Sequence, residues 1–248
     1  MKKVFISLCC LCLLSLANEV QTLSLSSGFG QPESDLIHNI MQEVSKRSGV
    51  KILYEALPNK RSLLTANSGV NDGETTRILE INKYYPNLVP VPVQSYSIDL
   101  MAVTNKNIKI ESPSDLSQYN VGVINGMKIA VLMAEKANPH SLIKVTDHET
   151  LIRMLLIDRL DVMITNKMGL LANIDKVKGT KLYLHTKPLM SRPLYMQLHK
   201  KNARYIPKFK DALESMHKDG SWKKIQDDFF KPYDAKLKSS FILIDSKN

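Results

Sequence analysis

The sequence predicts an α/β protein in which parallel strands are connected by helices. Two observations support this class. Short apolar or alternating runs, which are typical of strands, take turns with longer runs whose apolar residues recur at helical spacing. Glycines and capping residues also separate many of these runs, so that each has a defined start or end. Strand and helix patterns that alternate in this way imply parallel sheets with crossover helices.

The first half of the chain opens with a strand and a helix. Residues 22–26 (TLSLS) are expected to form the strand, and Ser34 is expected to cap a helix that ends at Gly49. The apolar residues at helical spacing are Leu36, Ile37, Ile40, Met41 and Val44. Next come strand 51–57, a short helix 59–68, and extended segments 88–94 and 97–104. Prolines in LVPVPVQ argue for irregular or edge pairing.

The second half repeats the alternation. Ser112 is expected to cap a helix with Pro113 at its first position, and Thr146 with Glu149 forms a capping box. The other expected elements are strand 121–124, helix 127–137, strand 142–145, helix 148–157, strands 161–165 and 181–185, extended segment 192–200, two final helices separated by Gly220, and a strand at 241–244.

The stretch NDGETTRIL (residues 71–79) places a cation after two threonines and before an apolar run. We expect residues 74–77 to form the first turn of a helix. Arg77 is unfavourable there because helix N-termini carry partial positive charge. An anion bound in front of the turn would resolve the conflict. An ion pair of Arg77 with Glu74 or Asp72 is the alternative.

The N-terminal segment is predicted to be a secretory signal peptide covering residues 1–17. Lysines precede the apolar run VFISLCCLCLLSLA, and Ser15 and Ala17 are small residues at the positions that a signal peptidase recognises. We expect cleavage near Ala17 and a periplasmic or secreted protein of 231 residues (248 − 17). An uncleaved membrane anchor is the alternative, although the run is short for a bilayer.

The three cysteines, Cys9, Cys10 and Cys12, all lie in this segment. The mature protein is therefore expected to have no disulfide, thiolate nucleophile or cysteine metal site. The histidines show no paired metal spacing, so neither a metal nor an organic cofactor is predicted. Without Lys2 and Lys3 the formal charge falls from +10 to +8. Basic clusters can mark nucleic-acid binding. The basic residues here are interleaved with core positions on predicted helices, which indicates that they lie on a solvent-exposed helix face.

The order of these elements and several local patterns resemble the family 3 extracellular solute-binding proteins, the periplasmic receptors of amino-acid-type uptake systems. ESPSDLSQYNVGVING (111–126) resembles the start of the family's second lobe, and TLIRMLLIDRLDVMITNK (150–167) resembles its leucine-rich helix, turn and following strand. MHKDGSWKKIQDDFF (216–230) resembles its closing signature. More narrowly, EALPNKRSL, NDGETTRI and YPNLVPVPV resemble an uncharacterised subgroup of these receptors.

The resemblance implies a two-lobed periplasmic-binding-protein fold (type II), with two α/β lobes joined by two crossover hinge strands. Lobe 1 would then cover residues 18–99 and 192–248, and lobe 2 would cover residues 100–191. The ligand would lie in the cleft between the lobes, at strand carboxyl ends and helix N-termini, where fixed dipoles favour anions. Closure around it would be a hinge motion.

The resemblance also implies a ligand-binding arginine. In the family, a Thr-x-x-Arg-like turn presents an arginine that grips the ligand's carboxylate through a bidentate pair, and Arg77 after Thr75 and Thr76 matches that position. A guanidinium suits this role because its planar fork fits a carboxylate and stays charged. The two threonine hydroxyls would supply further donors.

The other candidate ligand-binding residues are Phe29, Glu55, Arg61, Tyr96, Asn125, Gly126 and Asn166. Several have a structural alternative. Phe29 would stack on a ligand or cover the core, and Arg61 would contact an anion or lie on a helix surface. Glu55 would face the cleft or Arg61. Tyr96 would form the wall near the hinge, and Asn125 with Gly126 would open a helix facing the cleft.

Two departures from the family bear on the ligand. The strand that matches DVMITNK usually ends in an aspartate that holds the ligand's ammonium, and Asn166 stands at this position. The turn NGMK also lacks the Ser or Thr common beside its glycine. Both changes weaken the case for a standard α-amino acid. A carboxylate-bearing solute without a strong ammonium anchor, or a small polar or cyclic metabolite, fits as well.

The resemblance therefore predicts a monomeric, non-enzymatic receptor that captures a small polar, carboxylate-bearing solute for ABC-type uptake. A membrane permease would be its partner, and nucleic acid would not. One alternative is a ligand-sensing protein that acts on a membrane signalling partner. Another is a dehydratase-like enzyme on the same fold, with Glu55 or Glu74 as acid or base. No G-x-S-x-G elbow or dinucleotide fingerprint is present.

Overall fold

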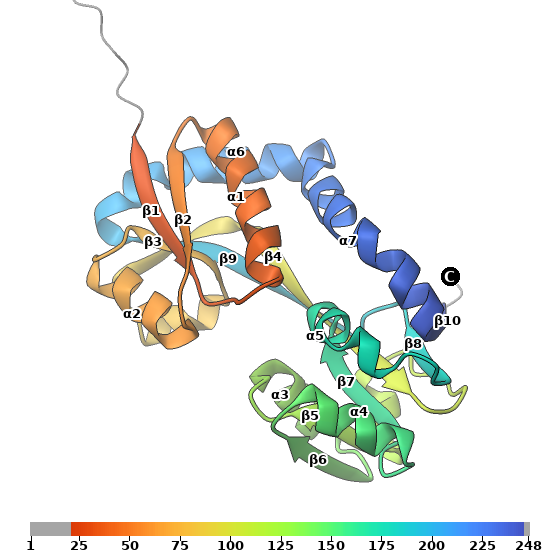
Figure 1. Cartoon of the computed structure of the whole chain (residues 1–248). Coiled ribbons are helices and arrows are strands. Elements are labelled where there is room, and N and C mark those ends of the chain that lie inside the picture. Colours follow the sequence, from red (N-terminus) through yellow and green to blue (C-terminus); the bar gives the residue numbers. More distant parts are fainter. Residues whose placement is uncertain (1–20, 246–248) are drawn as a thin grey trace, which may run out of the picture.

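A computed structural model describes residues 21–245 of the chain. The predicted signal peptide, with its cleavage near Ala17, lies outside the described residues. Two α/β lobes are joined by two long crossing strands (Figure 1). The predicted α/β class, with two lobes and two crossover strands, is therefore confirmed.

The first lobe is built on three parallel strands, and β1 lies between the other two. Its elements are β1 (Thr22–Ser27), α1 (Glu33–Ser48), β2 (Lys51–Ala56), α2 (Asn59–Ser68), β3 (Gly73–Arg77), the short 3-10 helices η1 (Leu79–Lys83) and η4 (Lys200–Tyr205), and α6 (Ile206–Lys218). The five apolar residues predicted for the first helix are all buried in α1. They form part of a core cluster that also includes Phe209 and Leu213 of α6.

The two crossing strands, β4 (Leu88–Thr104) and β9 (Met190–His199), pair antiparallel with each other. β9 also pairs with β3 of the first lobe, and β4 pairs with β7 of the second lobe. One sheet therefore runs through both lobes in the order β2-β1-β3-β9-β4-β7-β5-β6. The register shifts between Pro90 and Gln94, which agrees with the irregular pairing that the prolines predicted.

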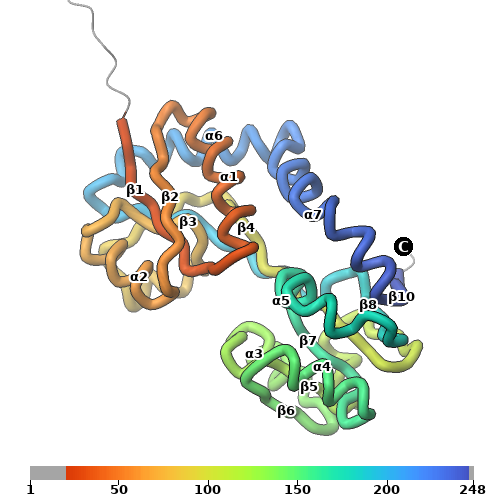
Figure 2. Tube along the Cα trace, viewed as in Figure 1, coloured from red at the N-terminus to blue at the C-terminus, as the bar shows by residue number. Residues whose placement is uncertain are grey.

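The second lobe follows the predicted alternation of strands and helices, as the trace in Figure 2 shows. Its elements are η2 (Pro113–Gln118), β5 (Asn120–Ile124), α3 (Lys128–Ala137), β6 (Ser141–Val145), α4 (His148–Leu156), β7 (Val162–Asn166), α5 (Lys167–Ala172), η3 (Ile174–Lys176) and β8 (Leu182–His185). β5 pairs in parallel with β6 and with β7. The β5–α3 turn and the end of β7 thus lie at the same edge of this sheet.

The C-terminal segment corrects one predicted lobe boundary. Helix α7 (Ser221–Ser240) contacts α1 and α6 of the first lobe and η3 of the second. It leads into β10 (Phe241–Ile244), which pairs in parallel with β8 (Figure 1). The last strand therefore belongs to lobe 2, although the resemblance placed residues 192–248 in lobe 1. The remaining boundaries, 18–99 and 100–191, stay a prediction.

Two predicted helix caps were wrong. Helix α1 begins at Glu33 after Pro32, so Ser34 lies inside the helix. Helix α4 is capped by Asp147, whose carboxylate accepts a hydrogen bond of 2.8 Å from the backbone N–H of Thr150. The predicted Thr146 cap lies one residue too early. A carboxylate at this position is favoured by the helix dipole. The predicted Ser112 cap is confirmed, although the following helix is of the 3-10 type.

Residues 73–77 form the strand β3 and not the first turn of a helix as the sequence predicted. Thr75 and Thr76 are β-branched, and such residues fit the pleated surface of a sheet. At Gly73, an added Cβ would lie 2.3 Å from the carbonyl oxygen of Gln197 on β9. The glycine therefore allows β3 to approach β9 and enter the sheet.

Candidate ligand-binding site

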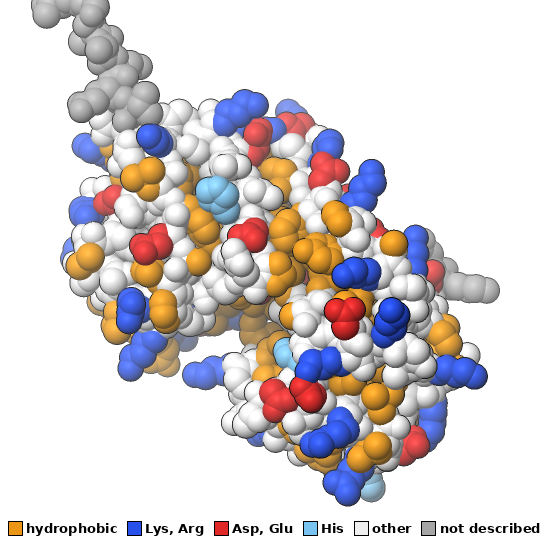
Figure 3. All heavy atoms as spheres, viewed as in Figure 1, with side chains coloured by type: hydrophobic (Ala, Val, Ile, Leu, Met, Phe, Trp, Pro, Cys, Tyr) orange, Lys and Arg blue, Asp and Glu red, His pale blue; other side chains and the backbone are white. Residues whose placement is uncertain are grey.

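A cavity of about 710 Å³ lies between the two lobes. Figure 3 shows the surface hollowed at this place. The first lobe and the crossing strands contribute Phe29, Asn59, Leu63, Thr76, Arg77, Ile78, Ile81, Ile98 and Leu194. The second lobe contributes Ile124, Gly126, Met127, Lys128, Ile129 and Asn166. This size is typical of pockets that hold small metabolites.

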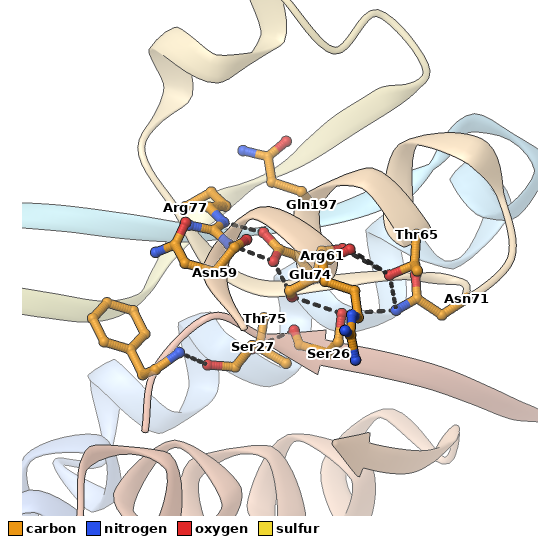
Figure 4. Close-up of polar contacts among 12 residues, drawn as sticks. Ser26, Ser27, Asn59, Arg61, Thr65, Asn71, Glu74, Thr75, Arg77 and Gln197 are labelled. Atoms are coloured by element: carbon orange, nitrogen blue, oxygen red, sulfur yellow. Dashed lines mark hydrogen bonds and ion pairs between the residues drawn. The ribbon is translucent and has the colours of Figure 1, made fainter. Parts of the chain in front are cut away.

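Arg77 lies at the end of β3 on the cavity wall, but it is bound closely to the protein itself. Its Nε donates to Glu74, and its Nη2 donates to the second oxygen of Glu74 at 2.7 Å. Nη2 also donates to the backbone oxygen of Asn59 at 2.9 Å, and Nη1 donates to the side-chain oxygen of Asn59 at 3.0 Å. Figure 4 shows these three side chains meeting.

These contacts show the alternative arrangement, in which Arg77 forms an ion pair with Glu74. A guanidinium has five N–H donors, and four of them meet the protein acceptors just described. One Nη1 donor is left for a solute. The bidentate grip on a ligand carboxylate, expected from the resemblance, is therefore unavailable in this arrangement. The conflict of a cation at a helix start also disappears, because Arg77 ends a strand.

Behind Arg77, polar side chains form a fully enclosed network. Glu74 is 0% exposed, and one of its oxygens also accepts from the hydroxyl of Ser62. Asn71 donates to the hydroxyl of Ser26 at 2.7 Å (Figure 4). The hydroxyl of Ser62 lies 2.8 Å from that of Ser26. Buried charges persist when they are paired and hydrogen-bonded, so this network holds Glu74 in place as the counter-ion of Arg77.

The two threonines of β3 have different surroundings. Thr75 is buried and its hydroxyl donates to the backbone oxygen of Ser26 at 3.3 Å. Thr76 lines the cavity, and its buried hydroxyl has no hydrogen-bond partner among residues 21–245. Successive side chains of a strand point to opposite faces. Of the two threonines predicted as donors, only Thr76 lines the cavity. Buried hydroxyls normally have a hydrogen-bond partner, so one is expected for Thr76.

Phe29 lines the cavity from the loop after β1 and also packs against the core. The alternative in which it covers the core is therefore observed, and stacking on a ligand stays a prediction. Its ring meets the ring of Tyr96 edge-on, with centroids 6.1 Å apart. Tyr96 is not part of the cavity wall; it lines a separate small pocket of about 40 Å³ together with Glu33. Burial raises the pKa of Glu33 to about 7, against a smaller opposing effect of its hydrogen bond with Tyr96.

The second lobe brings two of its three predicted residues to the cavity. Gly126 and Asn166 line it, whereas Asn125 is exposed outside it, with its backbone N–H bonded to Val145. The side-chain oxygen of Asn166 accepts from the backbone N–H of Gly169 at 2.8 Å and caps α5. Asn166 therefore carries a neutral amide at the position where the resemblance implies an aspartate.

Two predicted residues lie away from the cavity. Glu55 is exposed near the end of β2, and Arg61 is exposed on α2. The surface alternative for Arg61 is therefore the one observed. With Glu55 outside and Glu74 enclosed, neither of the two proposed acid–base groups of a dehydratase-like enzyme reaches the cavity.

Sequence reasoning missed Asn59 and Lys128. Asn59 is the first residue of α2, and Lys128 is the first residue of α3, directly after the Asn-Gly-Met turn. A helix start in the implied cleft was the available signal for both. Apolar wall residues such as Ile81 and Ile129 were also missed, because in a sequence they resemble core positions.

Within residues 21–245, no group of three or more His, Cys, Asp or Glu side chains could hold a metal ion. No helix in the same range is long and apolar enough to cross a membrane.

Comparison with known proteins found no matching family model. An uncharacterised protein of Shewanella oneidensis is 27% identical over 201 residues, which cover 78% of this chain and 72% of that protein.

Several solved structures share the fold. A probable amino-acid ABC transporter extracellular-binding protein of Bacillus subtilis has a TM-score of 0.67 at 16% identity, over 85% of this chain and 97% of that chain. The L-cystine solute receptor of Neisseria gonorrhoeae, in its unliganded open conformation, has a TM-score of 0.65 at 15% identity, over 86% and 94%. An ancestral arginine-binding protein bound to arginine has a TM-score of 0.56 at 22% identity, over 84% and 98%. The chain has the type II periplasmic-binding-protein fold.

Proposed function

We propose that this protein is a periplasmic solute-binding receptor related to the family 3 extracellular receptors, and that it captures a small carboxylate-bearing solute between its lobes. The observation that carries the proposal is the interlobe cavity, whose wall includes Thr76, and the buried hydroxyl of Thr76 has no partner among residues 21–245. The solved structures with the same fold support it, because they include an L-cystine solute receptor and a probable amino-acid ABC transporter extracellular-binding protein.

The carboxylate would bind at the wall formed by the end of β3. The hydroxyl of Thr76 and the remaining N–H of Arg77 would donate to it, and Lys128 would approach from the second lobe. Lys128 also begins α3, whose N-terminal backbone N–H groups favour an anion. Because these donors come from both lobes, a bound solute would stabilise the closed form.

The receptor would work as a monomer and deliver its solute to an ABC-type permease without performing a reaction itself. A secretory signal peptide over residues 1–17 would bring it to the periplasm. A role in sensing would use the same closing cleft with a different membrane partner. Binding of the solute is therefore the step to test first.

A thermal-shift screen of the mature protein against amino acids, small carboxylates and polar metabolites tests the proposal. A solute at about 100 times its dissociation constant should add roughly 2.7 kcal/mol to the free energy of unfolding. For a chain of this size that corresponds to a rise in Tm of about 5 to 10 °C. Thr76→Val serves as the cleft variant, because it removes a hydroxyl that has no partner within the described residues.

We expect Thr76→Val to keep the unliganded Tm and to reduce the shift caused by the solute. A shift that is identical in this variant would place the solute elsewhere than at the β3 wall. If no compound of a broad screen raises Tm, the receptor proposal itself fails.

A further inference from the structure

The charges on the cavity wall are unbalanced. Among the described residues, Arg77 and Lys128 line the cavity, and no Asp or Glu does. The charge of Arg77 is offset by the enclosed carboxylate of Glu74. Lys128 has no ion-pair partner among the described acidic residues and is exposed to solvent. The wall therefore carries one uncompensated positive charge, on the second lobe.

The rest of the cavity is apolar. Nine of its fifteen lining residues have large apolar side chains, namely eight aliphatic or phenylalanine side chains and that of Met127. They come from both lobes and from both crossing strands, with Ile81 and Ile129 among them. Among residues 21–245, the polar side chains of the wall are those of Asn59, Thr76 and Asn166, besides the two cations. Burial of apolar surface on both lobes would therefore supply most of the binding free energy.

An α-amino acid would bring an ammonium group into the cavity, and the described wall residues include no anionic partner for it. The neutral oxygen of Asn166 already accepts from Gly169. Both oxygens of Glu74 are engaged by Arg77, and one also by Ser62, behind the wall. An ammonium that is buried without an anionic partner loses its hydration and is strongly disfavoured. The absence of such a partner on the wall disfavours zwitterions.

We infer that the cleft selects an amphipathic monoanion: a carboxylate on an apolar aliphatic or aromatic body that carries no ammonium group. This inference rests on the proposed receptor function and narrows its solute. The carboxylate is held by Lys128 and Thr76 from opposite lobes, and the apolar body lies along the isoleucines. The solute thereby neutralises the one unpaired charge of the wall.

Isothermal titration calorimetry with matched pairs tests the inference. The probes are hexanoate with norleucine, 4-methylpentanoate with leucine, and 3-phenylpropanoate with phenylalanine. The two members of each pair differ only by the α-ammonium group. Hexanamide, 4-methylpentanamide and 3-phenylpropanamide test the need for the negative charge. We expect at least one carboxylate to bind tenfold or more tightly than both its amino acid and its amide.

Three variants assign this preference to residues. Lys128→Gln should weaken binding of the carboxylate by about fivefold or more, whereas Lys136→Gln, in the last turn of the same helix, should not change it. Asn166→Asp keeps a side chain able to cap α5 and adds the carboxylate that the wall lacks. It should lower the preference for the carboxylate over its amino acid at least tenfold.

Three outcomes would overturn the inference and leave the receptor function standing. The first is an amino acid that binds as tightly as its matched carboxylate. The second is a set of pairs that do not bind while polar solutes of the thermal-shift screen do. The third is an unchanged affinity for the carboxylate in Lys128→Gln together with an unchanged preference in Asn166→Asp, because the wall would then not set the selectivity. Failure of every solute in that screen would instead remove the receptor function.

Discussion

At the scale of single residues, the pair of Arg77 and Glu74 decides how a mutation at the cleft should be interpreted. The Arg77 side chain is 11% exposed and that of Glu74 is 0% exposed. Removing one partner of a buried ion pair leaves the other charge uncompensated, which typically costs about 3–5 kcal/mol. A loss of solute binding in Arg77→Ala would therefore reflect damage to the fold as well as a lost contact.

Arg77→Ala is expected to lower the free energy of unfolding by about 3–5 kcal/mol in urea denaturation. The double variant Arg77→Met with Glu74→Gln removes both charges and should be less destabilised than Arg77→Ala alone. If the double variant is the less stable of the two, the pair is not coupled in the way that the contacts indicate.

Glu33 predicts a pH dependence of stability. The pKa of its carboxyl is raised by burial from 4.5 to about 7. A raised carboxyl pKa means that the folded state binds the proton more tightly than the unfolded state does. The resulting contribution of Glu33 to the free energy of unfolding is full below pH 4.5 and is lost as the pH rises to about 7. The contribution is at most about 3–4 kcal/mol, because the pKa rises from 4.5 to about 7 and each pKa unit corresponds to about 1.36 kcal/mol.

Glu33→Gln should remove this dependence. The variant is expected to lose less stability than the wild type between pH 4.5 and 7, as measured by urea denaturation at several pH values. Burial lowers the pKa of half-buried His148 and of buried His185, so these groups add a pH dependence of their own. The difference between the two proteins is therefore the informative quantity. Equal slopes would show that Glu33 ionises at its ordinary pKa.

The sequence could predict which side chains approach the cavity only in part. Thr76, Arg77, Phe29, Gly126 and Asn166 line it as the resemblance implied. The sequence pattern could not predict the direction in which each hydrogen-bond donor points. The opposite faces of Thr75 and Thr76, and the partners of Arg77, depend on β3 lying between β1 and β9.

At the scale of elements, β3 shows how one glycine determines the position of the cleft wall. Gly73 lies against the backbone of β9, and the strand carries Thr76 and Arg77 to the cavity. Helix and strand patterns elsewhere were predicted well because they depend on local periodicity. The sequence around β3 is too short and too polar to show a period, so its capping residues were misread as a helix start.

Gly73→Ala is expected to separate β3 from β9, because the added Cβ would lie 2.3 Å from a backbone oxygen that cannot rotate away. Overpacking of this kind costs about 1–3 kcal/mol or more. Gly30→Ala is the matched control, since no heavy atom lies within 4 Å of its added Cβ. Urea denaturation should show a clear loss for Gly73→Ala and a change of at most about 0.5 kcal/mol for Gly30→Ala. Comparable losses in both would contradict this account.

At the scale of the whole molecule, the lobes are linked at three places. The crossing strands β4 and β9 form two links, and α7 with β10 forms the third. The resemblance implied only the two strands. Four residues (FILI) at the end of a helical segment do not indicate which sheet edge they will join, because strand pairing over long sequence distances is not encoded in local pattern.

Removal of residues 241–248 tests the third link. β8 would lose its parallel neighbour, and the buried side chain of Phe241 would leave the second lobe. We expect faster amide hydrogen exchange in β8, with unchanged exchange in β1 and β2. A uniform increase across both lobes would mean that the segment stabilises the molecule globally.

The position of β10 also has a practical consequence. The first strand, β1, lies in one lobe and the last strand, β10, lies in the other (Figure 1). Donor and acceptor dyes attached near Gln21 and Asp245 would therefore sit on different lobes. Energy transfer between them would follow the motion of the lobes as solute is added, with every residue of the cleft left unmodified. The protein could thus serve as the core of a fluorescent biosensor for its own ligand.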